Sequence, residues 1–182
     1  KYMNELLTNF VTLNASLLSV AISFFLFGYI FLDKFKPLKF ELFEWFPDPQ
    51  IVFEFYLDGL SGVMMVLICT LSLVIQLFST SYMSKDEKYT KYFEYFNFFV
   101  FSMLLLVLSG NFLVMFFGWE LVGLSSYLLI SFWSEKKSAS KAGNKAFILN
   151  RIGDFGFLIG LMMILNYFET VSYTHLRAHE TV

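Results

Sequence analysis

Five stretches of this chain are apolar for long enough to meet or approach the length that a helix needs to cross a bilayer. A hydrocarbon core of roughly 30 Å takes about 20 apolar helical residues. The five stretches run from about Thr8 to Leu32, Leu57 to Phe78, Phe93 to Leu108, Phe112 to Trp133 and Ala142 to Phe168. We therefore predict an all-α membrane protein with about five transmembrane helices in one bundle.

The composition supports a membrane protein and argues against several other classes. Charged residues make up only 15% of the chain, against about 25% in a soluble domain. A net charge of −2 argues against nucleic acid as a partner. Cys69 is the only cysteine and lies in an apolar stretch, so we expect no disulfide framework and no metal cluster. The chain has no GxGxxG, CxxC or flavin-site pattern, and we expect no cofactor to bind to it.

The segments between the apolar stretches indicate how the helices are connected. The link from Asp33 to Tyr56 mixes apolar and polar residues and contains all three prolines, which suits a segment at the membrane interface and allows a short hairpin. Ser109-Gly110-Asn111 predicts a tight turn, so the third and fourth helices should form an antiparallel pair.

The distribution of lysines predicts the orientation in the membrane. If the helices alternate in direction, one side holds six lysines and the other holds three. The six are Lys85, Lys88, Lys91, Lys136, Lys137 and Lys141, and the three are Lys34, Lys36 and Lys39. By the positive-inside rule, the side with six lysines should face the bacterial cytoplasm or the mitochondrial matrix.

The apolar stretch NFLVMFFGWELVGLSSYLLISFW, residues 111 to 133, contains one carboxylate, Glu120. A charge at a helix centre costs about 2.5–3.5 kcal/mol on insertion scales. Desolvation favours the neutral form of such a carboxyl, so Glu120 could exchange protons, or it could be a protonated group that bonds a neighbouring helix. The small residues around it, Gly118, Gly123, Ser125 and Ser126, predict that this region faces protein rather than lipid.

The last apolar stretch contains NRIGDFGFLIG, in which Arg151 and Asp154 have an i,i+3 spacing and share a helix face. Gly153, Gly156 and Gly160 predict a close-packing stripe on the same helix. The Arg151–Asp154 pair could simply neutralise itself inside the bundle. Together with Glu120, however, it forms a set of charges that marks an ion or proton pathway.

Two other charged residues have simpler interpretations. Lys145 precedes the Arg151–Asp154 pair and could extend the set of charges toward water, although by itself we favour a side chain that reaches the membrane surface. Asp58 begins an apolar stretch and is predicted to cap that helix.

Two segments carry a family resemblance. FLVMFFGWELVGLSSYLLISFW and KAFILNRIGDFGFLIG, with FYLDGLSGVMM upstream, resemble NADH dehydrogenase subunit 5 of respiratory complex I. The resemblance covers roughly Ile51 to Thr170. Mrp-type cation/proton antiporter subunits and the chloroplast NDH subunit have similar sequences and remain alternatives. A structural membrane subunit that uses the buried charges to hold its helices together is a further alternative.

The resemblance implies an antiporter-like bundle that moves protons while redox chemistry takes place in other subunits. Glu120 matches the family's buried glutamate in the GWE motif, Arg151 and Asp154 match the NR-x-GD motif, and Lys145 matches a lysine just upstream. In the family, the glutamate pairs with a lysine on a later helix. NADH:ubiquinone reductase activity then belongs to the whole complex, with NADH, FMN, iron–sulfur clusters and quinone in partner subunits.

The resemblance also implies partners and a location. The expected partners are other membrane subunits of complex I, the lipid bilayer and protons. The expected location is a mitochondrial inner membrane, a bacterial plasma membrane or a thylakoid. Residues 1–170 should form a partial antiporter-like domain that lacks the family's first helix and its later helices. Residues 171–182, VSYTHLRAHETV, do not resemble the family and are expected to lie outside this domain. Because SYTHLRAHET looks like a translated sequencing adapter, His175, Arg177 and His179 are given no role.

Overall fold

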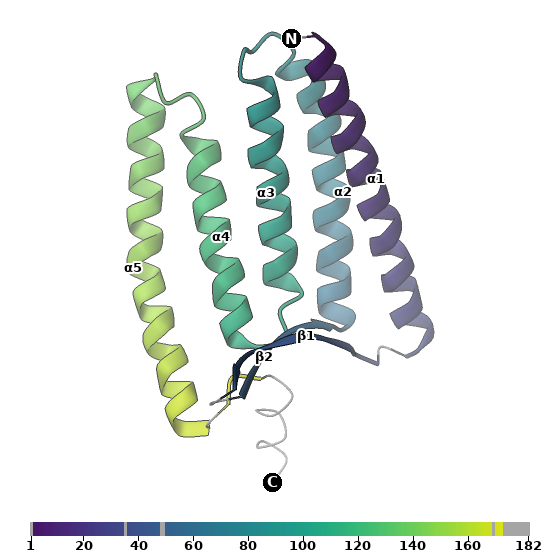
Figure 1. Ribbon diagram of the computed structural model, residues 1–182, viewed down its shortest axis with the longest axis vertical. Coiled ribbons are helices and arrows are strands. Elements are labelled where there is room, and N and C mark those ends of the chain that lie inside the picture. The colour runs from purple at the N-terminus through teal and green to yellow at the C-terminus, as the bar shows by residue number, and fades with distance from the viewer. Residues whose placement is uncertain (1, 35, 48–49, 169, 173–182) are drawn as a thin grey trace.

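The computed structural model describes residues 2–34, 36–47, 50–168 and 170–172. These residues form five helices and one two-stranded hairpin (Figure 1). In chain order the elements are α1 (Tyr2–Leu32), β1 (Leu38–Pro47), β2 (Gln50–Leu57), α2 (Gly59–Tyr82), α3 (Tyr89–Val107), α4 (Phe112–Ile130) and α5 (Lys137–Phe168). The predicted all-α membrane fold is therefore confirmed, with the addition of the hairpin.

Each predicted apolar stretch coincides with one helix, and the helices extend beyond several of the predicted limits. Among the described residues, four helices are long and apolar enough to cross a membrane, namely α1, α2, α4 and α5. The exception is α3, whose first turns carry Lys91, Glu94 and several tyrosines. Many large apolar side chains on the outside of the bundle are exposed, including Phe25 and Phe155, as a bilayer environment allows.

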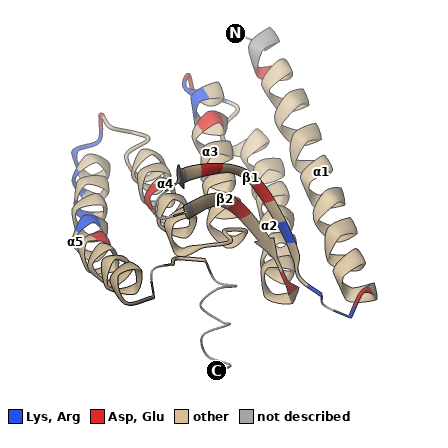
Figure 2. Ribbon diagram, turned by 60° about the horizontal axis from the view of Figure 1, so that its bottom comes forward, with Lys and Arg blue, Asp and Glu red and all other residues tan. Residues whose placement is uncertain are grey.

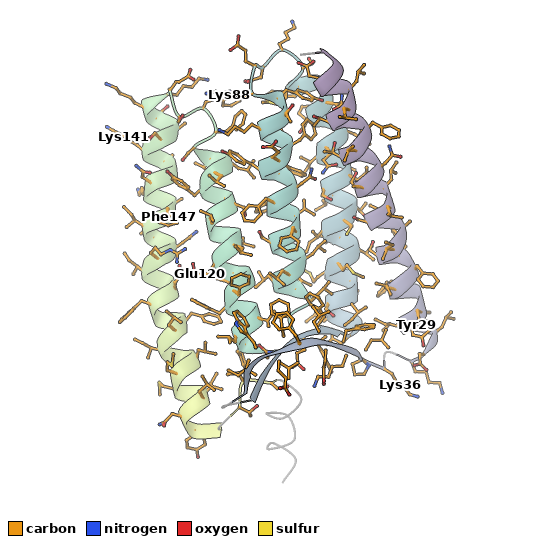
Figure 3. All side chains as sticks on the ribbon, viewed as in Figure 1. Tyr29, Lys36, Lys88, Glu120, Lys141 and Phe147 are labelled. Atoms are coloured by element: carbon orange, nitrogen blue, oxygen red, sulfur yellow. The ribbon has the colours of Figure 1, made fainter. Side chains whose placement is uncertain are left out.

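The helices lie side by side in chain order from α1 to α5, with consecutive helices running in opposite directions (Figure 1). The loops between α2 and α3 and between α4 and α5 therefore lie at one end, and the hairpin lies at the other. In Figure 3, Lys88 and Lys141 mark the first end and Lys36 marks the second. This arrangement confirms the predicted separation of the six lysines from the three.

Apolar clusters fill the bundle near both ends. The cluster near the hairpin consists of Ile30, Leu57, Met65 and Cys69. The cluster near the lysine-rich loops consists of Met83, Tyr89, Phe93 and Phe132. The charged groups discussed below lie between α4 and α5, away from both clusters.

The hairpin crosses the ends of the helices opposite the lysine-rich loops (Figure 1). Its strands pair antiparallel, as the mixed pattern of the link allowed. Asp58 follows β2 and caps α2, because its carboxylate accepts a bond from the Ser61 N–H at 2.8 Å while the Ser61 hydroxyl accepts one from the Asp58 N–H at 2.7 Å. The predicted capping role of Asp58 is confirmed.

Hydrogen bonds attach the hairpin to the turn between α3 and α4. The Gly110 N–H donates to the Glu54 carbonyl at 2.9 Å. The buried Glu54 carboxylate pairs with Lys39 at 2.8 Å. Its hydrogen bond raises the pKa of Lys39 above the ordinary lysine value, so this lysine is charged at neutral pH. The predicted turn at Ser109-Gly110-Asn111 is thereby held against the sheet.

The Asn111 side chain links the hairpin to α4, and replacing it should lower the stability of the protein. Its side-chain oxygen accepts from the Val114 N–H at 2.9 Å, and its amide donates to the Val52 carbonyl at 2.8 Å. We expect Asn111→Ala to lower the free energy of unfolding by about 1–3 kcal/mol, because it removes both a helix cap and a buried hydrogen bond.

Thermal unfolding of the purified protein in detergent would measure this loss. Asn14→Ala is the control, since the Asn14 amide bonds the Phe10 carbonyl on an exposed face of α1. Equal small changes in the two variants would contradict the structural role of Asn111.

The described part of the chain ends at Ser172. The Phe112 N–H donates to the Val171 carbonyl at 3.1 Å. The prediction that residues 171–182 lie outside the family domain falls mostly on residues 173–182. These residues, including His175, Arg177 and His179, lie outside the described residues.

Candidate charged site between α4 and α5

Glu120 lies near the middle of α4, about halfway between the lysine-rich end and the hairpin end (Figure 3). Figure 2 shows an acidic position within α4, and a basic and an acidic position within α5, on otherwise uncharged parts of these helices. The Glu120 side chain is 19% exposed, so most of its surface contacts protein. The prediction that this region of α4 faces protein is confirmed.

The Arg151 guanidinium contacts two carboxylates. It forms an ion pair with Glu120 across the helix interface. One turn further along α5, the carboxylate of Asp154 lies 3.5 Å from Arg151 Nε. The structure therefore unites the Glu120 of one helix with the predicted i,i+3 pair of the next.

Arg151 is also held by an aromatic ring. Its guanidinium carbon lies 4.9 Å from the centre of the Phe147 ring, one turn earlier on α5. A cation over a ring face is attracted by the ring quadrupole. Because the Arg151 side chain is still 43% exposed, it has room to change its position relative to the two carboxylates.

The two carboxylates differ in their surroundings. The Asp154 side chain is only 6% exposed, and its second oxygen accepts a hydrogen bond from the Trp119 indole N–H at 2.9 Å. Trp119 precedes Glu120 in the sequence and stacks on Phe157, with ring centres 6.3 Å apart. No sequence pattern indicates this role of Trp119, since the contact depends on how α4 and α5 face each other.

Small residues on α4 allow the close approach of both neighbouring helices. A Cβ on Gly118 would lie 2.7 Å from the backbone N and Cα of Leu106 on α3. A Cβ on Gly123 would lie 3.7 Å from the Asn150 amide nitrogen on α5. The small residues around Glu120 therefore have the predicted function of bringing helices together.

The predicted close-packing stripe on α5 has no packing partner among the described residues. No described atom lies within 4 Å of a Cβ added to Gly153, Gly156 or Gly160. At about 100° per residue, these glycines lie roughly 100–160° around the helix from Asp154. They therefore point away from α4, toward an open side of α5.

Lys145 does not join the charged group. It is exposed and forms no ion pair with any other described residue. It lies six residues before Arg151, which is about 9 Å nearer the lysine-rich end. The candidate site therefore consists of Glu120, Arg151 and Asp154, with Trp119 and Phe147 in contact with it.

The charge balance of this site determines what it can do. Two carboxyls and one guanidinium have a net charge of −1 when all three are ionised, and one bound proton makes them neutral. An unpaired charge is costly at this depth in a membrane, and the contacts of Arg151 with Glu120 and Asp154 offset part of that cost. The described residues contain no group of three or more His, Cys, Asp or Glu that could hold a metal ion.

Two family models match the sequence. Residues 45–93 match the model described as NADH-Ubiquinone oxidoreductase (complex I), chain 5 N-terminus. Residues 109–181 match the model described as NADH:quinone oxidoreductase/Mrp antiporter, TM. The second range contains all the residues of the candidate site and extends over most of the C-terminal segment that we expected to lie outside the domain.

The curated relatives are subunits of quinone oxidoreductases. Over 124 residues the chain is 41% identical to NADH-quinone oxidoreductase subunit L of Rickettsia bellii, an alignment covering 68% of this chain and 19% of that protein. Over 159 residues it is 41% identical to the chloroplastic NAD(P)H-quinone oxidoreductase subunit 5 of Adiantum capillus-veneris, covering 85% and 22%. The chain thus spans about a fifth of the length of these relatives.

Two solved structures share the fold. A chain of the membrane-bound sulfane sulfur reductase, an archaeal respiratory membrane complex, aligns with a TM-score of 0.81 and 21% identity, over 92% of this chain and 34% of that chain. A chain of the Mrp complex from Dietzia aligns with a TM-score of 0.70 and 20% identity, over 91% and 20%. At this identity the likeness shows the fold alone.

Proposed function

Because the chain belongs to the family of antiporter-like membrane subunits that includes chain 5 of NADH-quinone oxidoreductase, we propose that it is part of a subunit that moves protons across a membrane. Glu120 is the group that binds and releases the proton. The observation that carries this proposal is that two carboxyls, Glu120 and Asp154, share the guanidinium of Arg151 between α4 and α5, about halfway along α4.

The proposed step follows from electrostatics. While Arg151 pairs with Glu120, the positive charge keeps the carboxyl ionised. When Arg151 moves toward Asp154, Glu120 loses its cation in a medium of low dielectric constant and takes up a proton. The return of Arg151 releases that proton. In the complete subunit, a further cation on a later helix, as the family resemblance implies, would drive the same exchange.

The electron-transfer chemistry belongs to partner subunits in this proposal. NADH, FMN, iron–sulfur clusters and quinone would bind there, and other membrane subunits would transmit the redox energy to the helices described here. The lysine-rich end would face the matrix, cytoplasm or stroma. We assign Lys145 to the aqueous end of the proton path, between the lysine-rich surface and Arg151.

An Mrp-type cation/proton antiporter is the second candidate, and it is favoured by the model that matches residues 109–181. The two candidates differ in their driving force, because an antiporter exchanges cations without electron transfer. Transport that depends on sodium and continues without NADH would favour the antiporter.

Replacing Glu120 tests the proposed function. Glutamine has the shape of a protonated glutamate but cannot release a proton, so we expect Glu120→Gln to slow proton translocation by the assembled complex about tenfold or more. The measurement is the rate at which the interior of membrane vesicles containing the complex becomes acidic. This rate is normalised to the amount of assembled complex.

The matched control is Glu135→Gln, because Glu135 lies on the lysine-rich surface and pairs with Lys88. This control should translocate protons at the normal rate. If Glu120→Gln lowers only the amount of complex while translocation per complex is unchanged, Glu120 serves to hold helices together and the proposed function fails.

A further inference from the structure

The indole of Trp119 forms a hydrogen bond with one carboxylate oxygen of Asp154. Its N–H donates to Asp154 Oδ1 at 2.9 Å, and Arg151 Nε lies 3.5 Å from Oδ2. The first distance is that of a good hydrogen bond, whereas the second is longer than a charge-assisted bond usually is. Asp154 is therefore bonded closely to the tryptophan and only loosely to the arginine.

The surroundings make this hydrogen bond hard to replace. The Asp154 side chain is 6% exposed, so little water reaches it as an alternative donor. Indole can only donate a hydrogen bond, so it satisfies the carboxylate without adding a charge. Trp119 also stacks on Phe157, which lies on the same helix as Asp154, so one side of the indole is supported.

We propose that Trp119 is a positioning residue that keeps Asp154 from closing on Arg151. While the indole holds Asp154, the guanidinium remains available to Glu120. Without the indole, the unsatisfied carboxylate of Asp154 would draw Arg151 toward itself, and Glu120 would lose its cation. This inference rests on the proposed function, since it concerns which of the two carboxyls forms the closer ion pair with Arg151.

The test measures how much of Glu120 is protonated. In infrared spectra of the native complex containing the full-length subunit, the C=O band of protonated Glu120 is identified by its loss in Glu120→Gln. We expect Trp119→Phe, which keeps an aromatic ring but removes the N–H, to increase this band severalfold at neutral pH. The increase should be absent when Asp154→Asn is also present, because asparagine has no charge with which to compete for Arg151.

Trp133→Phe is the matched control. The Trp133 indole also donates to an aspartate at 2.9 Å, but that aspartate is Asp86 on the lysine-rich surface, so the Glu120 band should not change. A merely structural role for Trp119 predicts no increase in the band, or the same increase with and without Asp154→Asn, and either result would overturn the inference.

The result can be separated from a failure of the proposed function. If Glu120→Gln stops translocation while Trp119→Phe leaves the band unchanged, only the role of Trp119 is wrong. If Glu120→Gln translocates protons normally, the proposed function itself is wrong, whatever the band shows.

Discussion

Arg151→Gln is expected to slow proton translocation about as strongly as Glu120→Gln. Glu120 and Asp154 would then face each other with no cation between them, since Arg151 is the cation that both contact in the described part of the chain. Two carboxylates in a medium of low dielectric constant cannot both remain ionised. At least one of them would hold a proton with no cation nearby to displace it, and the exchange would slow.

The size of this effect follows from the exposure of Arg151. Removing one partner of a fully buried ion pair costs about 3–5 kcal/mol. The Arg151 side chain is 43% exposed rather than fully buried, so its loss should cost less than that. We therefore expect the complex to assemble and translocation to fall about tenfold, rather than the subunit to unfold.

Translocation per assembled complex would measure this effect, with Lys141→Gln as the control. Lys141 lies on α5 like Arg151 but near the lysine-rich end (Figure 3), and removing its charge should change little. If both variants translocated protons at the normal rate, Arg151 would have no part in the exchange.

Gly118→Ala should destabilise the subunit more than Gly123→Ala or Gly156→Ala. The added methyl group would lie 2.7 Å from backbone atoms of Leu106, which have no side-chain freedom with which to move away. Helices α3 and α4 would have to separate, at a cost of about 1–3 kcal/mol. Because Glu120 follows two residues later, its distance from Arg151 would also change.

The control for Gly118→Ala is Gly156→Ala, for which no described atom lies within 4 Å of the added methyl group. Alanine in an open helix position should be neutral or stabilise by up to about 1 kcal/mol. Thermal unfolding of the two full-length variants in detergent gives the comparison. A similar unfolding temperature for both variants would contradict the close contact between α3 and α4.

The sequence predicted the fold well because each main signal was local. Long apolar stretches predicted the five helices, and the residues between them predicted the tight turn and allowed the hairpin. The cap at Asp58 needed only the few residues around it. Alternating helix directions placed six lysines at one end and three at the other, and the structure has this arrangement.

The candidate site was predicted only in part because it spans two helices. The i,i+3 spacing placed Arg151 beside Asp154, but spacing within one helix says nothing about how that helix is rotated against the next. The contacts of Arg151 with Glu120 and of Trp119 with Asp154 depend on this rotation. The same limit applies to the glycines of α5, whose spacing resembled a packing stripe although they point away from α4.

The most direct test of the proposed mechanism is infrared difference spectroscopy of the native complex, comparing the resting state with the state energised by NADH. We expect a change in the C=O band of a protonated carboxyl that is absent in Glu120→Gln and present in Glu135→Gln. That result would mean that Glu120 gains or loses a proton during turnover. Identical difference spectra for the wild type and Glu120→Gln would contradict a role for Glu120 in proton exchange.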